Sequence, residues 1–178
     1  MPNWCSNSLT LTCPSKREAD ELCLFLEKKD TRQDEGEAES LFSYFLPEPD
    51  HDTGPDDAMP SWYWWRVNNW GTKWSENLYD WNKIDETTIQ FSFDTAWSPP
   101  IGVYEAMHEA GYAVEAQYFE PGMCFVGSWI EGSDEYFEYS SCESVKELRE
   151  TIPTELDDYW RISEDWWVEE EDEEILAS

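Results

Sequence analysis

Alternating polar and apolar residues predict the strands of this protein. Residues 7–13 (NSLTLTC) alternate and are rich in Thr, and residues 87–96 (TTIQFSFDTA) place Ile89, Phe91 and Phe93 on one face of a strand. Apolar runs bounded by turn residues predict further strands at residues 113–119, 123–130 and 135–139. The last three strands follow one another through short turns, so we expect them to form an antiparallel meander.

Helical periodicity follows the first two of these strands. Ser15 and Glu18 have the spacing of a capping box, and apolar residues then recur every three or four positions up to Leu26. Ser98 is expected to cap a second helix, which Gly111 ends. Two strand–helix–strand units in a chain of 178 residues predict an α+β fold, in which a ferredoxin-like antiparallel sheet has its helices packed on one face.

Two acidic segments interrupt or follow this pattern. Residues 1–140 are expected to form the ferredoxin-like domain, which contains a long acidic loop at about residues 31–60. Residues 141–178 are expected to form an acidic C-terminal extension that is mostly helical or irregular. Its last part, SEDWWVEEEDEEILAS, has the composition of a solvated tail, but Trp166 and Trp167 offer a means of anchoring it to the body or to a partner.

The most unusual segment is Ser61–Trp74 (SWYWWRVNNWGTKW), in which five of the fourteen residues are Trp. We expect a turn between two aromatic segments, with Asn69 or Gly71 at positive φ. Two interpretations remain open. In the first, alternate Trp side chains pack on the sheet. In the second, Trp and Arg side chains form an exposed patch of the kind found in the energetically dominant parts of protein interfaces.

Charge changes this picture more than any motif does. The chain has 41 Asp and Glu residues against 11 Lys and Arg residues, which gives a formal net charge of −30. Such a charge disfavours direct binding to nucleic acid or to anionic membranes, and it favours a basic partner, metal ions or solubility alone. The acidic loop contains Asp50, His51, Asp52, Asp56 and Asp57, but their spacing matches no calcium loop, so a solvated loop is the favoured interpretation.

Candidate chemistry is sparse. The five Cys residues include no CxxC pair, and only His51 and His108 could supplement them, so we expect no metal site. No helix motif for metal binding, glycine loop for phosphate or nucleophile elbow occurs, and we therefore expect no enzymatic activity, no catalytic residues and no cofactor. The start of the chain lacks a secretory signal and no apolar run is long enough to cross a membrane, so a cytoplasmic protein with reduced thiols is expected.

Three motifs together resemble a known family. The segments MPNWCSNSLTL, WYWWRVNNWGTKW and FSFDTAWSPP are similar to those of the YubB-like ferredoxin-like proteins of conjugative plasmids, genomic islands and phages. The resemblance covers about residues 1–140. It implies a ferredoxin-like fold and a mobile-element origin in a bacterial host, and it implies no catalytic residues. The positions that match the motifs are Asn3, Trp4, Cys5, Asn7, Asn68, Trp70, Gly71, Lys73 and Trp74.

These observations lead to one expected function and one alternative. The expected partner is a basic host nuclease or a nucleic-acid surveillance complex of a CRISPR or restriction system, which the protein inhibits by mimicking the charge of DNA. In the alternative, a host partner binds the Trp-rich segment 61–74 and charge serves only solubility. The candidate partner-binding residues are Glu164, Asp165, Glu169, Glu170, Glu171, Asp172, Glu173, Glu174, Trp62, Trp65, Arg66, Asn68, Trp70, Lys73 and Trp74.

Overall fold

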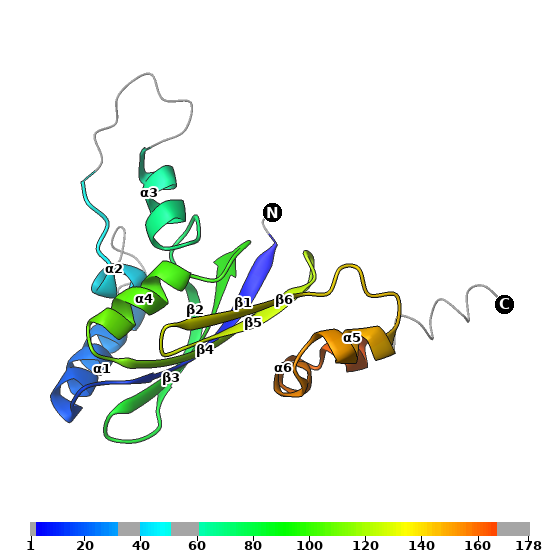
Figure 1. Ribbon diagram of the computed structural model, residues 1–178. Coiled ribbons are helices and arrows are strands. Elements are labelled where there is room, and N and C mark those ends of the chain that lie inside the picture. The colour runs from blue at the N-terminus through cyan, green and yellow to red at the C-terminus, as the bar shows by residue number, and fades with distance from the viewer. Residues whose placement is uncertain (1–2, 32–39, 51–60, 167–178) are drawn as a thin grey trace.

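A computed structural model describes residues 3–31, 40–50 and 61–166. These residues form an α+β structure around a six-stranded antiparallel sheet with the strand order β2-β3-β1-β4-β5-β6 (Figure 1). The elements, in chain order, are β1 (Trp4–Thr12), α1 (Lys16–Thr31), α2 (Leu41–Phe45), α3 (Ser61–Asn69), β2 (Asn77–Lys83), β3 (Thr88–Ala96), α4 (Ile101–Glu109), β4 (Ala113–Glu120), β5 (Phe125–Ile130), β6 (Ser133–Glu138), α5 (Val145–Thr151) and α6 (Thr154–Trp160).

The first strand is central in the sheet. β1 pairs with β3 from Trp4↔Ala96 to Thr12↔Thr88, and on its other side it pairs with β4. The helices α1 and α4 connect strands that are not neighbours, and this arrangement is consistent with the predicted ferredoxin-like class. The strands expected from alternation are all present, but β2 was not predicted. A register shift between Leu78 and Asp80 disrupts its alternation, and this explains why no period of two is visible in its sequence.

The main hydrophobic core lies between one face of the sheet and the helices α1, α2 and α4, which lie together on that side in Figure 1. Alternate strand residues point into it, because side chains of a strand alternate between faces. Ser15 caps α1 as predicted, but without the expected capping box: its hydroxyl accepts a hydrogen bond from the Arg17 amide and donates one to the Glu18 carboxylate. The core includes Leu9, Leu11, Leu22, Leu26, Phe91, Phe93, Val103, Met107 and Trp129.

A second hydrophobic cluster joins the C-terminal extension to the sheet. Val126 and the partly buried Phe119 project from the strands, and Leu148 and Ile152 from the α5 segment pack with them. Strand alternation places Phe119 and Val126 on the face opposite the main core, since their neighbours Tyr118 and Phe125 point the other way. The helices α5 and α6 of the C-terminal extension therefore lie on the face of the sheet opposite to α1, α2 and α4 (Figure 1).

One local prediction needs an addition and another needs correction. Residues 61–69 form the helix α3, in which Trp65 packs against the core and Arg66 lies over the ring of Trp62 one helical turn away. The predicted turn follows this helix, and Gly71 has the expected positive φ, 89°. Ser98 does not cap α4. Pro100 occupies the N-cap position without a side-chain hydrogen bond, and the Ser98 hydroxyl donates to the Gly71 carbonyl at 2.6 Å.

Candidate interaction site

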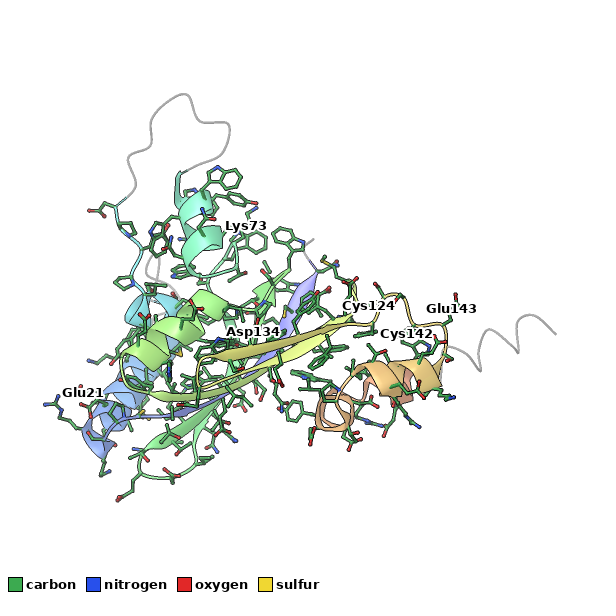
Figure 2. All side chains as sticks on the ribbon, in the orientation of Figure 1. Glu21, Lys73, Cys124, Asp134, Cys142 and Glu143 are labelled. Atoms are coloured by element: carbon green, nitrogen blue, oxygen red, sulfur yellow. The ribbon has the colours of Figure 1, made fainter. Side chains whose placement is uncertain are left out.

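Four aromatic side chains and one lysine gather where β1 begins and β3 ends, and we call them the aromatic cluster: Trp4, Tyr63, Lys73, Trp74 and Trp97. The Trp74 ring lies 6.2 Å from the Trp4 ring and 5.9 Å from the Trp97 ring. The Lys73 ammonium lies 4.9, 5.5 and 5.6 Å from the ring centroids of Trp74, Tyr63 and Trp97, within the range of cation–π attraction. Figure 2 shows Lys73 beside α3 at this end of the sheet.

The cluster contains a strained backbone position. Trp97 has a φ of 64°, a conformation that is uncommon for a bulky residue and costs on the order of 1–3 kcal/mol. Several hydrogen bonds hold it there: the Trp97 amide donates to the Asn3 carbonyl at 2.9 Å, and the Thr72 hydroxyl donates to the Ala96 carbonyl at 2.9 Å. Trp4 and Trp97 each remain 40% exposed, so this strain presents two large rings to solvent.

Beneath the cluster lies a buried polar network centred on Asn7. The Asn7 amide donates to the Cys5 carbonyl at 2.8 Å and to the Thr95 hydroxyl at 2.9 Å, and its carbonyl oxygen accepts from the Tyr104 hydroxyl at 2.9 Å. The Thr95 hydroxyl in turn donates to the Ser98 carbonyl at 2.7 Å. The network thus joins β1, β3 and α4 directly below the strained residue.

Removing the centre of this network should destabilise the fold. We expect Asn7→Ala to lower the free energy of unfolding by about 2 kcal/mol, because it leaves the Tyr104 hydroxyl without its acceptor in a buried environment. Urea denaturation followed by fluorescence measures this change. The matched control is Asn82→Ala on the exposed side of β2, which should shift stability by less than about 0.5 kcal/mol. Equal effects of the two substitutions would contradict the structural role assigned to Asn7.

The candidate residues of α3 and of the turn that follows it divide into buried and exposed members. Trp70 is 2% exposed, and its indole donates to the Leu46 carbonyl at 2.9 Å, so this residue belongs to the core and offers no surface to a partner. Trp65 also packs against the core. The Arg66 guanidinium forms an ion pair with Glu48 at 2.6 Å and lies 5.0 Å from the ring of Trp62. Asn68 is exposed.

The candidate acidic residues fall mostly outside the described part of the chain. Glu164 and Asp165 are both exposed, and Glu164 forms an ion pair with Arg161 at 2.6 Å, which offsets part of its charge locally. The remaining candidates, Glu169, Glu170, Glu171, Asp172, Glu173 and Glu174, lie beyond residue 166. Trp166 contacts the ring of Tyr139 at 6.0 Å, so the proposed anchoring of the extension to the body holds for this residue.

A different acidic region is visible in the described residues. Residues 84–145 contain twelve Asp or Glu residues and no Lys or Arg. They form β3, α4, β4, β5 and β6, and thus supply four of the six strands of the sheet. Asp134, Glu135 and Glu138 are exposed on β6, and Figure 2 labels Asp134 there. Residues 84–145 therefore contribute negative charge to the surface and contain no Lys or Arg that would offset it.

Burial disfavours the charged forms of two thiols and one phenol in the core. Burial raises the pKa of the Cys5 thiol far above its usual value, and it raises the pKa of Cys13 to about 11. Burial also raises the pKa of Tyr104 strongly. A thiol with a raised pKa is a poor nucleophile at neutral pH, because the thiolate is the reactive form. Cys5 and Cys13 thus act as small core residues.

In residues 3–31, 40–50 and 61–166, no three His, Cys, Asp or Glu side chains come together in a way that could hold a metal ion. Across the same residues, no helix combines the length and the apolar character that a bilayer span requires.

Three members of the aromatic cluster, Trp4, Tyr63 and Trp97, were not among the candidate residues predicted from the sequence, although Tyr63 lies in the Trp-rich segment. Trp4 and Trp97 both lie in motifs noted above, but they are 93 positions apart in the chain. The β1–β3 register, in which Trp4 faces Ala96, is what brings them together. One Trp precedes the strand predicted at residues 7–13 and one follows the strand predicted at residues 87–96, but only the pairing of the two strands shows that these Trp residues lie close together.

Comparisons with known proteins add little to this geometry. A comparison with models of protein families found no match, and a comparison with curated proteins found none either. A comparison with solved structures found a likeness to the crystal structure of a protein api92 from Yersinia pseudotuberculosis, described under the family designation DUF1281. The two chains are 10% identical with a TM-score of 0.42, and the match covers 80% of this chain and 99% of that chain. A likeness at this level carries no argument about the function of this protein.

Proposed function

We propose that this protein is a non-enzymatic inhibitor that occupies the cationic nucleic-acid-binding surface of a basic protein. The observation that supports it best is the absence of Lys and Arg from residues 84–145, where twelve carboxylates lie on or between ordered elements. Proteins that grip DNA do so with Lys and Arg side chains that contact phosphates. Carboxylates held on a rigid scaffold can compete for the same cations, often through paired hydrogen bonds to Arg.

The resemblance to the YubB-like family indicates which kind of protein the partner is, because the family implies a mobile-element origin. A mobile element gains from blocking a host defence complex, so we propose a restriction nuclease or a CRISPR surveillance complex in the bacterial cytoplasm as the target. The finer fold assignment, ferredoxin-like, is also a proposal; the order β4-β1-β3-β2 with α1 and α4 as crossovers supports it.

Competition with DNA tests the proposal. A purified restriction endonuclease and a purified CRISPR surveillance complex are each loaded with labelled duplex DNA, and the protein is added at several salt concentrations. We expect it to displace DNA from at least one complex, with an apparent affinity that falls roughly tenfold or more between about 50 and about 200 mM salt, because counterions screen the contacts. Displacement that is insensitive to salt would contradict charge mimicry, as would the absence of displacement from both complexes.

One observation favours a second candidate function, docking of a host protein on the aromatic cluster. Strain at Trp97 and the exposure of Trp4 and Trp97 are features of binding surfaces more than of cores. Two variants separate the candidates: Trp4→Ala combined with Lys73→Ala alters the cluster, whereas Glu135→Gln combined with Glu138→Gln lowers the charge of β6. Loss of displacement by the first variant alone would favour the aromatic cluster, and loss by the second alone would favour the acidic surface.

A further inference from the structure

The outer edge of β6 is an unpaired strand. β6 is the last strand in the order β2-β3-β1-β4-β5-β6, and five of its six residues are exposed. No other described strand pairs with its outer side. An edge strand presents unpaired backbone N–H and C=O groups, which form a template for another strand.

The register of the hairpin identifies which groups face outward. β5 and β6 pair from Ile130↔Ser133 to Phe125↔Glu138, and only Glu131 and Gly132 separate them. In such a hairpin the residues that flank the turn form a hydrogen-bonded pair, and every second pair repeats the pattern. The Tyr139 amide donates to the Cys124 carbonyl at 2.9 Å, which continues the same alternation. Asp134, Tyr136 and Glu138 therefore direct their N–H and C=O groups away from β5.

The same strand carries charge of a single sign. Asp134 and Glu138 lie on one face of β6 and Glu135 lies on the other, and all three are exposed. Acidic side chains on an edge disfavour pairing with a second copy of this strand, since like charges would then face each other. They favour a strand that carries Lys or Arg, and residues 84–145 contain no cation of that kind to compete with it.

We propose that β6 is a docking edge to which a basic, extended segment of the partner protein adds as a seventh strand of the sheet. Backbone hydrogen bonds to Asp134, Tyr136 and Glu138 provide the binding geometry, and the three carboxylates select for Lys and Arg. This inference rests on the proposed function, because it takes a basic partner as given, and it adds the way in which that partner is held.

A peptide probe tests the inference directly. The probe is a short peptide, blocked at both ends, in which Lys alternates with Thr; its matched control has the same sequence with every backbone nitrogen methylated. Both carry equal charge, but the control cannot donate backbone hydrogen bonds. We expect the unmodified peptide to bind the full-length protein at least about tenfold more tightly at low salt, a difference equivalent to one or two hydrogen bonds.

Amide hydrogen exchange locates the contact. Binding of the unmodified peptide should slow exchange at Asp134, Tyr136 and Glu138, whereas the amides of Ser133, Glu135 and Phe137, already bonded to β5, should change little. Protection confined to β2, the other edge of the sheet, would overturn the inference.

The outcomes distinguish the two proposals. Equal binding of the two peptides would overturn strand addition and leave the charge-based function standing. Failure of both peptides to bind at low salt would count against both proposals. Replacement of Glu135 and Glu138 by Gln should weaken both peptides, because it removes charge without changing the backbone of β6.

Discussion

Trp70→Ala is expected to lower the free energy of unfolding by about 3–5 kcal/mol, the range for removing a large buried aromatic side chain. Trp70 is 2% exposed and packs edge-on against Phe42 at 5.7 Å and against Trp65 at 5.7 Å. Its indole N–H also donates to the Leu46 carbonyl, and the Arg66 guanidinium lies over its ring. The substitution removes all of these contacts and leaves a cavity between α2, α3 and the sheet.

The same segment offers a control for this prediction. Trp64 is 54% exposed, so Trp64→Ala should change stability by less than about 1 kcal/mol. Both variants lose one indole, which keeps the change in side-chain volume equal. Chemical denaturation monitored by circular dichroism compares them with the parent. Similar losses at the two positions would show that Trp70 does not anchor α3 in the way described.

Gly102→Ala is expected to lower the free energy of unfolding by about 3 kcal/mol, although Ala is favoured over Gly within a helix by about 1 kcal/mol. An added methyl group at Gly102 would lie 1.7 Å from the Asn69 carbonyl oxygen and 2.8 Å from the Asn69 carbonyl carbon. Both atoms are backbone, so α4 and the end of α3 must move apart to admit it. Thermal unfolding measures the loss.

This displacement should also reach the aromatic cluster. Asn69 is three residues before Thr72, which together with Gly71 fixes the segment leading to Lys73 and Trp74. We therefore expect Gly102→Ala to change the near-ultraviolet circular dichroism of the folded protein, which reports on the packing of Trp rings. Glu105→Ala, at an exposed position of the same helix, is the control and should leave both stability and this spectrum nearly unchanged. A variant as stable as the parent would contradict the close approach of α4 to α3.

The strands were predictable from sequence where alternation was clean. β3 shows why. Ile89, Phe91 and Phe93 are all buried and the residues between them are not, so the two-residue period in the sequence matches the pattern of burial in the structure. β2 carries a register shift at Leu78/Asp80, which hides the period, and it escaped prediction. The helix α3 was not predicted for a different reason. Trp has a high strand propensity, but packing of Trp65 and Trp70 on the core decided the local structure.

The candidate site was only partly predictable. Lys73 and Trp74 were expected from the Trp-rich segment, and both lie in the aromatic cluster. Trp97 joins them because hydrogen bonds from Thr72 and to Asn3 hold its neighbourhood in place, and such contacts between distant segments leave no local pattern in the sequence. The unpaired edge of β6 also needed the strand order, which alternation alone does not provide.

The central position of β1 affects how the protein folds during synthesis. Of the described strands β1 is made first, yet its two partners are β3, which ends at Ala96, and β4, which ends at Glu120. Leu9 and Leu11 therefore stay without their neighbours on β3 until residue 96 has been added, and without those on β4 until residue 120 has been added. Folding that depends on such distant contacts is slow, and an unpaired apolar strand is prone to aggregate in the meantime. We therefore expect β1 to be the segment that chaperones protect during synthesis.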